Sequence, residues 1–163
     1  MIPRVITIGA VVLSALGAAV DAAGGDRRGS TTARAQGARV IRLVGTDDMK
    51  FDTTVLQARR GERLRVVLTT VSSMPKVAMA HNFVLLAPTV DVEAFITASA
   101  VARDNQFIAP AYARGVLAAT GLAGAGESVE VTFTVPTTPG RYPFVCSFPG
   151  HYAAGMRGVL VVK

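Results

Sequence analysis

Alternation of apolar and polar residues dominates the sequence after Arg39. In the stretch 63–70 every even-numbered residue is Leu, Val or Thr, and in 128–135 every odd-numbered residue is Val or Phe. Because successive side chains of a strand point to opposite faces, this pattern places one face in a core and the other near water. The chain is therefore predicted to fold mainly from strands.

Shorter strands are predicted in five further stretches, 40–44, 55–58, 82–87, 141–146 and 158–162. Between strands lie turn residues such as Arg60-Gly61 and the segment 136–140. One stretch departs from the pattern: from Asp91 to Arg103 apolar residues recur at helical spacing, and Asp91 can cap the helix start. Many short strands and a helical insertion within 88–126 predict an all-β Greek-key β-sandwich.

The first 35 residues have a different composition from the rest. Arg4 precedes an apolar run over residues 5–20, and a stretch rich in Gly, Ala, Ser and Arg leads to Ala35. This arrangement is typical of a secretory signal peptide, with cleavage near residue 35 or near 22–23. An uncleaved N-terminal membrane anchor with a linker is the alternative, tethering the protein through residues 5–20. Either interpretation leaves one domain, residues 36–163, in the periplasm or another extracytoplasmic compartment, secreted or membrane-anchored.

Charge and cysteine content narrow the classes of function. The whole chain has 17 basic and 11 acidic residues; four and two of these precede residue 36, which leaves 13 and nine, or +4. Such a charge attracts an acidic partner or an anionic membrane surface, or serves solubility alone. The basic residues are spread along the chain, so a nucleic-acid partner is not expected. A single Cys excludes a disulfide scaffold.

The scarcest reactive residues gather near the C-terminus. Cys146, His151 and Met156 lie on one predicted loop between two strands, and His81 begins an earlier strand. A soft thiolate, two imidazoles and a weak thioether form the ligand set that selects a mononuclear copper for electron transfer. The four residues are therefore candidate metal ligands.

Two segments carry a resemblance to a known family. The sequence MPKVAMAHNFVL at 74–85 and the sequence CSFPGH at 146–151 resemble the two ligand segments of azurin-like blue copper proteins, in the cupredoxin family. The resemblance extends from residue 49 to residue 163. It implies a cupredoxin β-sandwich with one type 1 copper, cycling between Cu(I) and Cu(II). It also implies that His81, Cys146 and His151 are equatorial ligands and Met156 the axial ligand.

The same resemblance assigns roles to residues around the ligands. The Ala80 carbonyl occupies the place of a second, weak axial oxygen, and Asn82 matches the residue that ties the two ligand segments together. The backbone N–H groups of Asn82 and Phe148 are expected to point at the Cys146 sulfur, and such hydrogen bonds tune a metal site. Pro149 has no N–H to contribute.

Two features depart from azurin. Four residues separate His151 from Met156, where azurin has three, so the ligand loop is similar to that of auracyanin or plastocyanin. The azurin disulfide is also missing, because Cys146 is the one Cys of the chain.

The implied function is that of an electron carrier that performs no bond chemistry. Its partners would be redox proteins, a cytochrome-type or copper-enzyme donor and acceptor. They would dock near His151 on an apolar rim formed by Met74, Met79, Phe148, Tyr152 and Ala153.

Three other functions compete with this prediction. A copper or zinc carrier, for which the metal is cargo, would use the same four side chains. An enzyme with Cys146 as nucleophile, a His as base and Asn82 as orienting residue would leave Met156 without a role. A structural zinc site usually has four strong ligands, whereas this set has three and a thioether.

Overall fold

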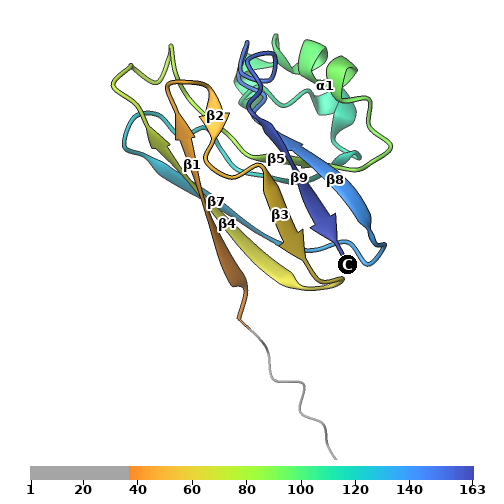
Figure 1. The fold of residues 1–163 in the computed structure, drawn as a ribbon. Coiled ribbons are helices and arrows are strands. Elements are labelled where there is room, and N and C mark those ends of the chain that lie inside the picture. The colour runs from red at the N-terminus through yellow and green to blue at the C-terminus, as the bar shows by residue number, and fades with distance from the viewer. Residues whose placement is uncertain (1–36) are drawn as a thin grey trace, which may run out of the picture. The chain divides into compact units, whose positions relative to one another are not determined.

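Two packed β-sheets form the domain in this computed structural model, which describes residues 37–163. Figure 1 shows the two layers, with the chain ending just below the lower end of the strand labelled β9. The predicted signal peptide or anchor lies outside the described residues. Within 37–163, no helix has the length and apolar character needed to cross a bilayer.

The four-stranded sheet has the order β2-β1-β4-β7, and β1 and β4 run parallel, whereas its other pairs are antiparallel. Its strands are β1 (Arg39–Thr46), β2 (Lys50–Phe51), β4 (Arg63–Val71) and β7 (Ser128–Thr134). Leu64, Val66 and Leu68 of β4 are fully buried, as the alternation predicts. One face of this sheet therefore covers the core and the other meets solvent.

The five-stranded sheet has the order β3-β9-β8-β5-β6, with β3 and β9 parallel. Its strands are β3 (Val55–Ala58), β5 (Val84–Leu86), β6 (Val116–Ala119), β8 (Gly140–Val145) and β9 (Arg157–Val162). The strand predicted over 82–87 is shorter, since β5 begins only at Val84, and the N–H of Phe83 donates to the Thr120 side chain instead of a backbone carbonyl. Strand β2 was missed because two residues are too few to show a period, and β6 was missed because it lies within 88–126, the stretch interpreted as a helical insertion.

Between β5 and β6 the chain makes the predicted helical excursion. It contains α1 (Val92–Ser99) and two 3-10 turns, η1 (Arg103–Asn105) and η2 (Pro110–Tyr112). Asp91 caps α1 by accepting a hydrogen bond from the Ala94 N–H at 3.1 Å. All three residues of β5 are buried because the sandwich core covers one face of the strand and α1 the other.

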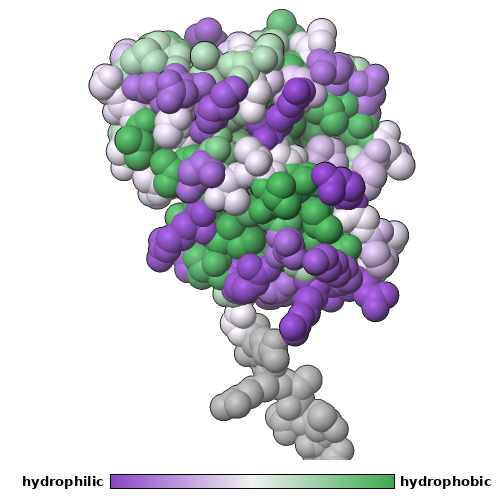
Figure 2. Space-filling model, viewed as in Figure 1, coloured by the Kyte–Doolittle hydropathy of each residue, from purple (hydrophilic) through white to green (hydrophobic). Residues whose placement is uncertain are grey.

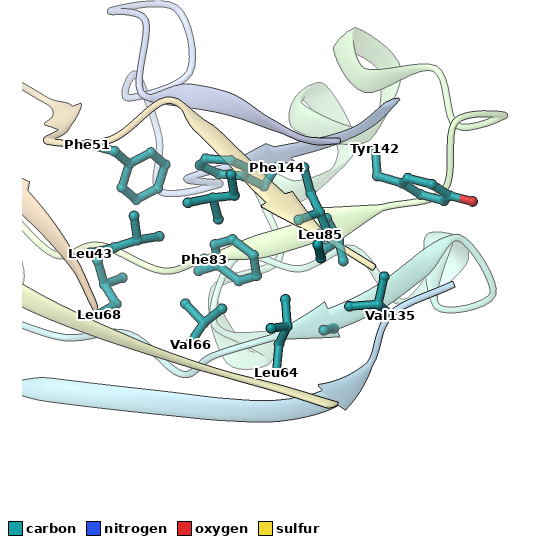
Figure 3. Packing of buried hydrophobic residues seen from close by; sticks show 14 of the residues in the cluster. Leu43, Phe51, Leu64, Val66, Leu68, Phe83, Leu85, Val135, Tyr142 and Phe144 are labelled. Atoms are coloured by element: carbon teal, nitrogen blue, oxygen red, sulfur yellow. The ribbon is translucent and has the colours of Figure 1, made fainter. Parts of the chain in front are cut away.

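The core lies between the sheets and includes the rings of Phe51, Phe83 and Phe144 (Figure 3). The Phe144 ring lies 5.5 Å from the Phe51 ring and 5.2 Å from the Phe83 ring, measured between centroids. The same cluster of buried residues includes Cys146 and Met156. Two candidate ligands are therefore fixed by the packing that stabilises the fold.

Candidate metal centre

Three candidate ligands meet at one end of the sandwich. The nearest ring nitrogens of His81 and His151, both Nδ1, lie 3.1 Å apart, and the Sγ atom of Cys146 lies 3.5 Å from Nδ1 of His151. One donor atom from each of the three residues falls within 4.8 Å of the others. All three side chains are buried, and His151 is 2% exposed. Their convergence confirms that sequence positions 70 residues apart form one cluster.

Backbone hydrogen bonds hold the ligand loop closed. Cys146 N–H donates to the Met156 carbonyl at 3.0 Å, and Met156 N–H donates to the His151 carbonyl at 2.9 Å. His151 N–H donates to the Phe148 carbonyl at 3.1 Å, and Gly150 takes a positive φ of 85° that favours glycine. The loop thus links its own three candidate ligands directly through the main chain.

His81 is held from the other side of the site. Its N–H donates to the Ala123 carbonyl at 2.9 Å, and its carbonyl accepts from the Ala123 N–H at 2.8 Å. This reciprocal pair anchors the residue just before β5. The preceding residue, Ala80, is fully buried, and the axial role of its carbonyl stays a prediction.

Asn82 connects the two ligand segments, as expected from the sequence. Its Oδ1 accepts a hydrogen bond from the Ser147 N–H at 2.8 Å, and its Nδ2 donates to Ser147 Oγ at 2.9 Å. Nδ2 also donates to the Gln106 carbonyl at 3.2 Å. Asn82 therefore joins the His81 segment, the Cys146 loop and the helical insertion in one buried network.

Burial and hydrogen bonding set the protonation of the thiol. Burial raises the pKa of Cys146 to about 12, and backbone N–H groups of Asn82 and Phe148 directed at the sulfur partly oppose this rise. These are the two N–H donors expected from the sequence. Without a metal the side chain is a neutral thiol at pH 7. A cation that binds here must displace a proton, and the two N–H groups then stabilise the thiolate.

Both imidazoles are neutral at physiological pH. Burial lowers the pKa of His151 to about 4, with the positive charge of protonated His81 as a second cause. Burial also lowers the pKa of His81. Neutral imidazole nitrogens carry the free lone pairs that a metal ion requires. The donor chemistry of the cluster therefore fits a soft, redox-active metal.

Met156 is fully buried and reaches the same end of the core. Its Cε atom would lie 2.9 Å from a Cβ placed on Gly45, and the His81 Cδ2 atom would lie 2.6 Å from that Cβ. Met156 and His81 thus approach the same backbone position on β1. The Met156 side chain therefore lies beside the His81 ring, and its role as axial ligand stays a prediction.

Gly45 was missed by the sequence analysis. A Cβ at this position would overlap the His81 ring, so only glycine allows β1 to approach the ligands so closely. An isolated glycine inside a strand pattern is the signal that could have identified it, since such a residue often marks close approach of the backbone to another group.

The predicted apolar rim needs one correction. Met79 is 5% exposed and belongs to the interior, and its N–H donates to the Pro75 carbonyl in the turn at 75–79. Phe148 and Tyr152 are half-buried, and Ala153 is exposed. The Phe148 ring packs at 4.8 Å from the His151 ring, measured between centroids. The rim near His151 is therefore smaller than predicted.

A β-sandwich that converges one thiolate, two imidazoles and a thioether at a buried end defines the class of mononuclear type 1 copper proteins. Comparison with family models matches residues 38–163 to "Copper binding proteins, plastocyanin/azurin family". The chain belongs to this family, and the azurin-like resemblance is confirmed. Its cofactor is a single type 1 copper, and His81, Cys146, His151 and Met156 are the residues that would hold it.

Individual relatives agree with this assignment. The chain is 46% identical to auracyanin-B of Chloroflexus aurantiacus over 83 residues, and this match covers 50% of this chain and 35% of the relative. It is 37% identical over 124 residues to azurin of Bordetella pertussis, covering 74% of this chain and 81% of the relative. The chain thus spans about a third of the first relative and most of the second.

Solved structures of similar fold include two auracyanins. The reduced auracyanin of Roseiflexus castenholzii matches with a TM-score of 0.68 and 30% identity, over 78% of this chain and 99% of that one. Auracyanin A of Chloroflexus aurantiacus matches with a TM-score of 0.69 and 28% identity, over 78% of this chain and 100% of the auracyanin chain. Those chains consist almost wholly of a domain of this extent, and residues Ala35–Lys163 form a compact unit in this chain.

Proposed function

We propose that this protein carries single electrons between redox proteins outside the cytoplasm, without performing bond chemistry on a substrate. The observation that carries the proposal is the convergence of His81, Cys146 and His151 in a buried site, with Met156 packed at the same place. When bound, a type 1 copper supplies a one-electron Cu(I)/Cu(II) couple. Thiolate and thioether favour the reduced ion and imidazole accepts the oxidised one, so one ligand set serves both states.

The chain's contribution is to keep the ligands in place. Electron transfer is fast when ligands move little, and here the loop hydrogen bonds, the Asn82 network and the His81–Ala123 pair fix each ligand segment. Burial of the site excludes water and other ligands. His151 lies just beneath the surface at 2% exposure, which shortens the path to a partner.

Visible absorption and thiol chemistry test the metal assignment together. The oxidised, copper-loaded domain should show an intense visible charge-transfer band, and Cys146→Ser should lose it. Iodoacetamide should not label the loaded protein, and it should label the folded metal-free protein only slowly, because Cys146 is then a buried neutral thiol. Rapid labelling of the loaded protein with hydrolytic activity would instead support the Cys146 nucleophile.

A copper carrier using the same residues is the second candidate, and kinetics separates the two. An electron carrier retains its copper in the presence of a chelator and is reduced and reoxidised rapidly without losing colour. A carrier releases copper to the chelator within minutes. The near-complete burial of every ligand favours retention.

The docking surface is proposed around His151, with Phe148, Tyr152 and Ala153 at its edge. Redox encounters use small interfaces, below about 1,200 Å², and this compact rim suits such a contact. Ala153→Lys should slow electron exchange with a redox partner while the copper spectrum stays unchanged. Ala100→Lys, at an exposed position beyond the end of α1, is the matched control and should leave the exchange rate unchanged. Equal rates in both variants would remove this surface from the proposal.

Location outside the cytoplasm is supported by the apolar run at 5–20 and the following linker-like stretch. Cell fractionation of the full chain tests it. Recovery with the periplasmic or membrane fraction is expected, and recovery with cytoplasmic markers would contradict it.

A further inference from the structure

The end of the sandwich away from the metal centre carries a concentration of positive charge. An open hollow of about 920 Å³ lies between the start of β1, the β3–β4 turn and the residue after β9. We define the basic end as the five exposed cationic residues that line it, namely Arg39, Arg59, Arg60, Arg63 and Lys163. Hydrophilic side chains gather at this lower part of the domain in Figure 2.

This charge is largely uncompensated. Glu62 is the one acidic residue that lines the hollow, and it pairs with Arg39. Within residues 37–163, the other four cations make no ion pair. The side chains around the hollow thus sum to +4. The formal charge of residues 37–163 is also +4, because the eight basic and eight acidic residues outside the hollow cancel in number. The domain's excess positive charge therefore sits at one end.

The basic end and the metal centre lie at opposite ends of the same strand. Met156 immediately precedes β9 and Lys163 immediately follows it, so about 20 Å separates the two ends at the usual rise per strand residue. Figure 1 shows β9 running from the loops beside α1 down to the chain end. A surface held against the basic end would leave the neighbourhood of His151 free.

The N-terminal segment joins the domain at this same place. Gly37, the first described residue, lines the hollow. The preceding segment includes the apolar run at 5–20 that was interpreted as a signal peptide or membrane anchor. If residues 5–20 are retained as an anchor, the domain is attached to the membrane through the end that carries its excess charge.

We propose that the basic end docks the domain on an anionic membrane surface. Guanidinium groups bind phosphate oxygens through paired hydrogen bonds, and the open hollow gives several headgroups access at once. Each Lys or Arg near an anionic bilayer strengthens binding roughly fivefold. Docking holds the metal centre away from the bilayer, where a partner reaches it, and operates with or without a retained anchor.

Vesicle sedimentation with the copper-loaded domain, residues 37–163, tests the proposal without the apolar run. Binding is expected to phosphatidylcholine vesicles that contain phosphatidylglycerol, and to fall as salt screens the charges. Pure phosphatidylcholine vesicles should not bind it. The double variant Arg60→Gln/Arg63→Gln should bind the anionic vesicles roughly 25-fold more weakly, at about fivefold for each charge.

A second double variant, Arg103→Gln/Arg114→Gln, provides the matched control. It removes the same charge from exposed positions in the helical insertion and should lose less than twofold, roughly. Neither pair of arginines makes a side-chain hydrogen bond within 37–163, so both variants should fold, and an unchanged visible spectrum verifies this.

Four results would overturn the proposal: no binding to anionic vesicles, equal binding to neutral vesicles, an equal loss in both double variants, or tighter binding to an acidic polypeptide than to the vesicles. Release by soluble glycerol phosphate at low concentration would assign the hollow to a small anion instead. Because the readout is sedimentation, these outcomes are independent of whether the copper exchanges electrons.

Discussion

Replacing Asn82 with Ala should destabilise the metal-free domain far more than replacing its main partner, Ser147. In Asn82→Ala the buried Ser147 N–H loses its acceptor at 2.8 Å, and leaving such a donor unpaired costs about 1–3 kcal/mol. The bonds from Nδ2 to Ser147 Oγ and to the Gln106 carbonyl are lost as well, each contributing about 1 kcal/mol. We expect a total loss of about 3–5 kcal/mol in the free energy of unfolding.

Ser147→Ala is the matched control because it removes the hydroxyl and keeps the backbone N–H paired with Asn82 Oδ1. Its expected cost is about 1 kcal/mol. Urea unfolding of both metal-free variants measures the difference, read from the midpoints at constant slope. If Asn82→Ala were no less stable than Ser147→Ala, the Asn82 network would not be what joins the two ligand segments.

Three further perturbations address the same end of the molecule. Gly45→Ala should lower the free energy of unfolding by about 1–3 kcal/mol, measured by thermal unfolding, because its Cβ would lie 2.9 Å from the Met156 methyl. Unchanged stability would mean that β1 can move away from the ligands without cost. Lys50 donates to the Ala154 carbonyl in the ligand loop, so Lys50→Met should increase cleavage of that loop by a protease, and unchanged cleavage would contradict this. Metal-free stability should be full above pH 6.5 and fall toward pH 4, because unfolding lets His151 take up a proton that the folded state, with a pKa of about 4, excludes. Denaturant midpoints across that range measure the slope, and a His151→Phe variant should show a flatter one.

Much of the sandwich could be predicted from local pattern. The alternation in β4 and β7, the Asp91 cap and the turn residues depend on neighbours a few positions away, so they are visible in the sequence. Strand β2 was missed because its two residues are defined only by pairing with β1, and β6 was missed because it lies at the end of the stretch interpreted as a helical insertion. The helix predicted as far as Arg103 ends at Ser99.

The ligands were identifiable because their types are rare and their chemistry specific. Two His and one Cys in the entire chain leave few ways to build a soft metal site, and all three converge. The inward turn of Met79 was not identifiable, because it depends on how distant segments pack against the site, and the isolated glycine at position 45 could indicate a close approach but not that His81 and Met156 make it.

The distribution of charge also shows which features the sequence predicts and which only the fold decides. In the sequence the basic residues are spread out, and this spacing argues only against a nucleic-acid partner. Folding brings Arg39, the turn at 59–63 and Lys163 to one end of the sandwich, where they form a surface of single sign. Residue types and local periods are properties of short stretches, so the sequence by itself determined the strand-rich fold and the ligand chemistry. Juxtaposition arises only when two sheets pack and bring remote positions together, so the tertiary structure decided the assembled metal centre and the basic end.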